Sequence, residues 1–203
     1  MQFSILKLAV AALAVSSETV LGAVMKPRAI TAAQMVDNIK MITQKSQALQ
    51  APAQSITVLN GPLIAVGLGP FPLTICVNQQ IIAGFTDIVS TATTAIAQMQ
   101  GSAPVPAGND AKAIFEAFRE FVRVHQALLN ILIGKAGLFN TIPLIGQPVA
   151  AVLRQVEAIV DTIAFGIIDL VESQAEDLMS QANSLGSSLE VCIQSYDGLS
   201  LTK

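Results

Sequence analysis

The sequence is poor in charged residues, in aromatic residues and in histidine. Only 12% of its 203 residues are charged and the net charge is −3, whereas an average domain has about 25% charged residues. No basic run is present, so nucleic acid is not expected as a partner. Aromatic residues make up 4%, with one Tyr and no Trp, so stacking platforms for bases or sugars are poorly supplied. The apolar residues are mainly Ile, Leu, Val and Ala, which suit acyl chains as readily as a packed core.

Residues that could perform catalysis or bind a metal are scarce. His125 is the single histidine, and it lies on the apolar side of a predicted helix between Phe121 and Leu128, where a histidine is usually packed. No serine stands in a G-x-S-x-G elbow, and no HExxH motif or Cys/His cluster indicates a metal. We therefore predict that the protein is not an enzyme and has no catalytic residues, metal ligands or cofactors. An esterase would need a Ser or Cys within hydrogen-bond reach of His125.

The first 22 residues have the pattern of a secretory signal peptide. Lys7 gives a short positive region, and residues 8–15 are apolar. Residues 20–22 are of types that a signal-peptide cleavage site accepts, so cleavage is expected after residue 22. The alternative is a buried first helix. The last residues are too polar and too short for a lipid-anchor signal. We predict a secreted chain with these parts: signal peptide 1–22, linker 23–30, helical domain 31–198 and tail 199–203.

Apolar residues recur every three or four positions along the mature chain, which predicts amphipathic helices. The central one covers residues 71–99, and its polar face is almost uncharged. Before it, Thr31 and Gln34 form a predicted capping box, and Pro52 should kink the first helix or divide it into two collinear pieces. Further helices are expected after loops rich in Gly and Pro. The predicted fold is all-α, an antiparallel bundle of four to five amphipathic helices.

A membrane-spanning helix is not expected. The apolar stretch over residues 56–82 is long enough to span a bilayer, but Gly, Pro, Asn and Gln interrupt it repeatedly. Within it, residues 63–68 could be taken for a strand. We prefer an apolar connection or a ragged helix end, because no second strand is available to pair with it.

Two cysteines, Cys76 and Cys192, are far apart in the sequence. In a secreted chain, a disulfide is the first interpretation. It would tie the start of the second helix to the C-terminal segment. The alternative is two buried free thiols, because pairing needs a proximity that the sequence does not show.

Three segments resemble the fungal hydrophobic surface-binding protein A family, which also includes cell-wall mannoproteins. They are DNIKMITQKSQALQAPAQSIT (37–57), NGPLIAVGLGPFP (60–72) and IIAGFTDIVSTATTAI (81–96). The resemblance implies a secreted helical domain that adsorbs to hydrophobic surfaces or holds lipids such as fatty acids in an apolar cavity. Some members assist a polyester-degrading, cutinase-like esterase. The Ser/Thr-rich tail and lipid anchor of the mannoprotein members are missing here, which favours a released form over wall anchoring.

Apolar helix faces can enclose a channel between them, where an acyl chain gains about 0.8 kcal/mol per buried CH₂ group. Gln, Ser and Thr side chains at helix ends could supply donors to its carboxylate. The alternative is that the residues facing the channel are ordinary core. The candidate lipid-binding residues are Ile81, Phe85, Ile88, Phe115, Phe118, Phe121, Leu128, Val156, Ile159 and Ile163.

A second set of residues could contact a hydrophobic surface: Leu63, Phe71, Phe165 and Ile168. Phe165 and Ile168 break the apolar pattern of their helix, so either the helix bends at Gly166 or the two side chains are displayed. Three hypotheses follow, in this order: a lipid carrier, a surface adsorber and a small esterase.

Overall fold

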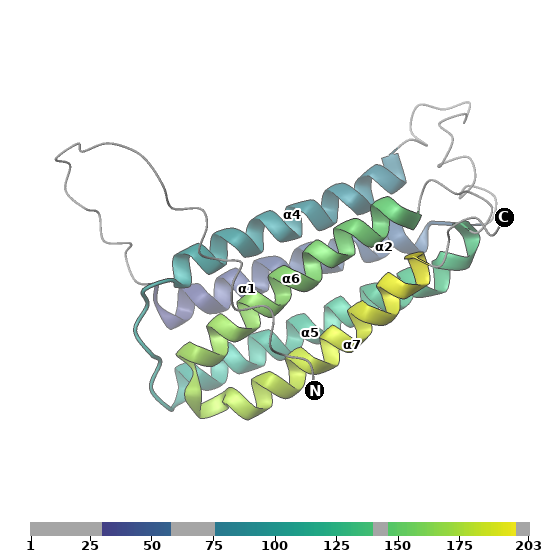
Figure 1. Ribbon diagram of the computed structural model, residues 1–203. Helices are drawn as coiled ribbons and strands as arrows, with labels where there is room; N and C mark the ends of the chain where they lie inside the picture. Colours follow the sequence, from purple (N-terminus) through teal and green to yellow (C-terminus); the bar gives the residue numbers. More distant parts are fainter. Residues whose placement is uncertain (1–29, 58–75, 140–145, 198–203) are drawn as a thin grey trace, which may run out of the picture.

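A computed structural model describes residues 30–57, 76–139 and 146–197 of the chain (Figure 1). The predicted signal peptide, residues 58–75 with Leu63 and Phe71, and the predicted tail lie outside these described residues. The described part is helical and contains no strand. Its elements are α1 (Ala32–Ala48), α2 (Gln50–Gln54), α4 (Cys76–Met99), α5 (Asn109–Ala136), η2 (Gly137–Phe139), α6 (Gly146–Leu170), η3 (Glu172–Gln174) and α7 (Ala175–Asp197).

Five long helices pack in a ring, whose arrangement can be followed in Figure 1, and their buried side chains form one apolar core. Helix α1 packs against α4 and α5, α6 packs against α4 and α7, and α5 closes the ring against α7. The all-α helical bundle predicted from the sequence is therefore confirmed. Each helix turns its apolar stripe inward, because the core is the only place where that face avoids water.

Hydrogen bonds between the ends of the helices fix their directions. The Ile30 N–H donates to Ser102 Oγ (3.3 Å), and the Val105 N–H donates to Leu170 O (2.7 Å). The starts of α1, α5 and α7 and the ends of α4 and α6 therefore meet at one end of the bundle. Consecutive long helices are antiparallel, as predicted. The ring nevertheless places parallel helices side by side, α1 with α5, α5 with α7 and α4 with α6.

The start of α1 agrees with the sequence pattern. Thr31 Oγ1 accepts from the Gln34 N–H, and Gln34 Oε1 accepts from the Thr31 N–H, which completes the predicted capping box. The predicted division of the first helix is also present, between α1 and α2 at Leu49. Pro52 lies in the first turn of α2, where its missing N–H has no helical partner to lose.

Helix α4 approaches this division closely. At Gly84 a Cβ atom would overlap the side chain of Leu49, so a larger residue here would force the Leu49 side chain to move. At the far end of α2, Lys135 Nζ donates to Gln54 O (3.0 Å) and Ile56 O (2.6 Å). These bonds tie the end of α5 to the end of α2 and satisfy helix-end carbonyl groups.

Candidate functional site: an apolar cavity and a buried serine–histidine pair

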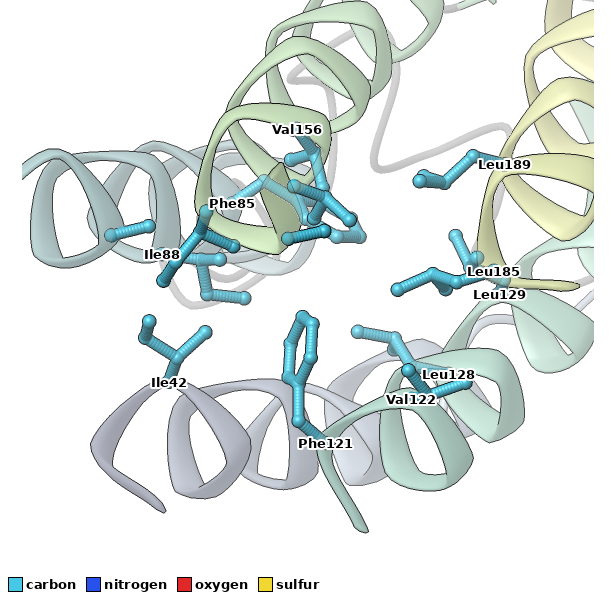
Figure 2. Close-up of a cluster of buried hydrophobic side chains, with 14 of the residues drawn as sticks. Ile42, Phe85, Ile88, Phe121, Val122, Leu128, Leu129, Val156, Leu185 and Leu189 are labelled. Atoms are coloured by element: carbon cyan, nitrogen blue, oxygen red, sulfur yellow. The ribbon is translucent and has the colours of Figure 1, made fainter. Parts of the chain in front are cut away.

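A small cavity lies inside the bundle, between α1, α4, α5 and α6. The volume available to the centre of a water-sized sphere is about 10 Å³, roughly what one water molecule requires. Figure 2 shows Phe121 of α5 pointing into the interior in the direction of Val156 of α6, with Ile42 of α1 to one side. All side chains that line the cavity are apolar: Ile39, Ile42, Ile88, Ala92, Phe118, Phe121, Ile159, Val160 and Ile163.

Half of the candidate lipid-binding residues line this cavity: Ile88, Phe118, Phe121, Ile159 and Ile163. Ile81, Phe85, Leu128 and Val156 are buried in the core but do not line the cavity. Phe115 is only half-buried, and the Arg119 guanidinium lies 5.7 Å from the centre of its ring. Phe115 therefore lies at the rim of the bundle, away from the cavity.

Four lining residues are absent from the candidate set: Ile39, Ile42, Ala92 and Val160. Each belongs to the apolar stripe of its helix, so the periodic pattern of the sequence could have identified them as lining residues. Ala92 is easily overlooked, because a small side chain contributes space to a cavity rather than surface.

A buried polar pair adjoins the cavity. Ser46 Oγ lies 2.9 Å from His125 Nδ1, and both residues are 0% exposed. The Ser46 hydroxyl also donates to Ile42 O (3.1 Å), a bond typical of serine inside a helix. With its hydrogen used there, Ser46 Oγ is assigned as the acceptor of the Nδ1–H of His125. The sequence could have indicated Ser46, because this serine interrupts the apolar stripe of the first helix.

The second ring nitrogen of His125 has no hydrogen-bond partner. Among the described residues, Nε2 is the one buried side-chain nitrogen or oxygen atom without a partner. The rings around it are apolar: Phe121 lies 5.3 Å from the imidazole and Phe85 6.1 Å, between ring centres. Burial lowers the pKa of His125 from 6.5 to about 4, because desolvation disfavours the imidazolium. The imidazole is therefore neutral at physiological pH.

The Ser46–His125 contact meets the distance condition set above for an esterase. Its surroundings differ from those of a nucleophile, because both side chains are fully buried and Ser46 lies inside α1, where the backbone N–H groups serve helical hydrogen bonds. An oxyanion needs preorganised donors that are free to receive it. The contact therefore supplies the distance that an esterase requires, without an exposed nucleophile or free donors beside it.

The thiol of Cys192 is free and buried in the structure, with Sγ 4.0 Å from Leu129 O. Burial raises its pKa to about 12, so the thiol is protonated at physiological pH. Cys76 begins α4, but the structure does not describe its side chain. The predicted Cys76–Cys192 disulfide therefore stays a prediction.

Of the four surface-contact candidates, two are described. Phe165 is 53% exposed, and Ile168 is partly buried against the core. Helix α6 continues through Gly166 to Leu170, so Phe165 is displayed on its outer face. Leu63 and Phe71 lie outside the described residues.

The described segments offer no group of three or more His, Cys, Asp and Glu side chains that could hold a metal ion. Within the same segments, the search for a helix long and apolar enough to cross a membrane found none.

The fold is shared with two solved structures. One is Afmp4p in complex with palmitic acid, with a TM-score of 0.68 and 14% identity over 82% of this chain and 99% of that one. The other is ligand-binding domain 1 of the MP1 protein of Penicillium marneffei, complexed with arachidonic acids, with a TM-score of 0.59 and 14% identity over 80% of this chain and 98% of that one. The chain has their fold. No protein-family model and no curated protein matches the sequence.

Proposed function

We propose that this chain binds fatty acids between the helices of its bundle. The observation that carries the proposal is a wholly apolar cavity inside a fold shared with two proteins that were solved with fatty acids. Cavities lined by apolar side chains with few polar groups are typical of lipid sites. The chain's resemblance to the hydrophobic surface-binding protein A family supports the same proposal. Membership of that family is part of what we propose.

The cavity has room for about one water molecule, so an acyl chain enters only when side chains or helices move apart. Each CH₂ group that leaves water contributes about 0.8 kcal/mol, and this gain offsets the loss of packing around the cavity. Binding is therefore expected to be coupled to a widening of the space between α1, α4, α5 and α6.

The direct test is native mass spectrometry of the purified full chain before and after palmitic acid is added. A one-to-one adduct, with a higher unfolding temperature in excess palmitic acid, is the expected result. If the chain forms no adduct and is not stabilised at saturating palmitic acid, the proposal is contradicted.

The variant Ala92→Leu is expected to weaken palmitic acid binding at least tenfold, about 1.4 kcal/mol. The larger side chain fills the cavity, and making room in a packed core typically costs about 1–3 kcal/mol. Ala97→Leu is the matched control, because Ala97 is exposed on the same helix. Isothermal titration of both variants measures the effect, and equal affinities for the two would show that the acyl chain binds elsewhere.

A second function, adsorption to hydrophobic surfaces, is favoured by the 53% exposure of Phe165. Secretion, association with the cell wall and assistance to a cutinase-like esterase belong to this second proposal, since the family resemblance implies them. We propose that the chain acts in these roles by binding and not as an enzyme.

Phe165→Ser is expected to reduce depletion of the protein onto hydrophobic beads severalfold, because the variant removes the exposed ring. Val191→Ser is the control, since Val191 is 51% exposed on α7. A pull-down in which both variants deplete like the natural chain would count against a contact through Phe165.

A further inference from the structure

His125 is held in a position that packing alone does not explain. A buried polar atom without a hydrogen bond is rare in a folded protein, and leaving it so costs about 1–3 kcal/mol. Nε2 of His125 is such an atom. An apolar side chain at this position would avoid the cost, which suggests that Nε2 receives a partner from outside the chain.

The geometry directs this atom toward the interior of the bundle. Nδ1 faces Ser46 of α1, and the two ring nitrogens point away from one another, so Nε2 points away from α1. The rings of Phe85 from α4 and Phe121 from α5 both pack against the imidazole.

The pair is also continuous with the cavity. Phe121, which packs on the imidazole, lines the cavity, and so does Ile42, whose carbonyl oxygen accepts from Ser46. His125 follows Phe121 by four residues on α5, and Ser46 follows Ile42 by four residues on α1. Residues four apart lie on the same helix face one turn on, so the pair forms the next layer at one end of the cavity.

The hydrogen-bond assignment selects the chemistry of the partner. Because Nδ1–H donates to Ser46, Nε2 carries a lone pair and accepts. In an apolar site the neutral form of a carboxylic acid is favoured over the carboxylate. The O–H of a neutral carboxyl group can therefore donate to Nε2.

We propose that His125, oriented by Ser46, binds the protonated carboxyl group of a fatty acid through Nε2, with the acyl chain extending along the cavity past Phe121 and Phe118. This inference rests on the proposed function and specifies the group that the site recognises. It places the polar contact in the middle of the bundle, in contrast to the helix-end donors expected from the sequence.

The test compares palmitic acid with its methyl ester, which has the same acyl chain but no O–H group. A site built around a hydrogen bond rejects an analogue that lacks it. We expect the natural chain to bind palmitic acid about tenfold more tightly than methyl palmitate, which corresponds to about 1.4 kcal/mol. In His125→Leu the ratio of the two affinities should fall to about one, since leucine has no acceptor.

Gln126→Leu is the matched control on the same helix. Gln126 donates to Ser184 and Ser188 on α7, away from the cavity, so the control should keep the natural ratio. A His125→Leu protein that keeps this ratio, or a natural chain that binds both ligands equally, would overturn the inference while leaving fatty-acid binding intact. A natural chain that binds neither ligand would overturn the proposed function and this inference together.

A second measurement does not depend on a variant that folds. His125 is the one histidine of the sequence, so ¹⁵N-histidine labelling gives a single imidazole in the NMR spectrum. Palmitic acid should shift the Nε2 resonance strongly, and methyl palmitate should shift it much less. Identical shifts with both ligands would show that His125 is a structural residue.

Discussion

Replacement of Phe121 by alanine is expected to lower the free energy of unfolding by about 3–5 kcal/mol, the usual range for a buried phenylalanine. Phe121 is buried, lines the cavity and packs on both Phe118 and His125. Truncation removes these contacts and joins the vacated space to the existing cavity. Because the helices around it are held by the rest of the ring, little collapse is expected to compensate.

Phe165→Ala is the control for this prediction, because it removes the same side chain from an exposed position on α6. A surface change of this kind usually alters stability by about 0.5 kcal/mol or less. Urea unfolding of both variants, followed by circular dichroism, gives the two values. Similar losses in the two would mean that Phe121 is not part of a tightly packed core.

Acidification is expected to destabilise the protein through His125. The folded state lowers the pKa of this group from 6.5 to about 4, whereas the unfolded chain titrates near the ordinary value of about 6.5. Between these pH values the unfolded chain binds a proton that the folded chain does not. The stabilisation is therefore complete above pH 6.5, falls as the pH falls toward 4, and amounts to about 3 kcal/mol at 1.36 kcal/mol per pKa unit.

Other groups act in the opposite direction and must be separated from His125. Burial raises the pKa of Glu157 and of Asp161 on α6, and Asp161 and Glu190 raise that of Glu157 further. These carboxyl groups favour the fold at low pH. The His125→Leu variant retains them, so the difference between its profile and the natural one isolates the histidine.

The measurement is the free energy of unfolding at several pH values from 4 to 7 for both proteins. Ser46 in the variant keeps Ile42 O as its acceptor, so the substitution leaves no new unsatisfied hydroxyl. We expect the difference between the two proteins to change by about 3 kcal/mol across this range. A constant difference would show that the imidazole is not shielded from water.

The helices were predictable from the sequence because their apolar stripes and end signals are local. The box formed by Thr31 and Gln34 and the interruption before Pro52 depend on residues a few positions apart, and both are present. The display of Phe165 was left open, because a helix can either bend or continue at a glycine. The structure decides it by continuing α6 past Gly166.

The neighbours of each helix were not predictable in the same way. An apolar stripe indicates that a face is buried but not which helix covers it. The cavity needs Ile39 from α1 and Ile163 from α6 at the same level, and this depends on the ring order. For the same reason His125 looked like an ordinary packed histidine, because its contact with Ser46 joins residues 79 positions apart.

The parallel neighbours also shape how the chain reaches its fold. When two consecutive helices form a hairpin, only a short loop is closed. Helix α1, however, packs against α5, with α4 between them in the sequence, and α5 packs against α7, with α6 between them. Their bonds therefore span long stretches of sequence, such as the 64 positions from Leu132 to Tyr196. Folding slows as the mean sequence separation of contacts increases, because the entropy of closing each loop is lost before its contacts form. The ring has a higher contact order than the same helices would have in successive hairpins, and its apolar faces stay uncovered for longer while the chain folds.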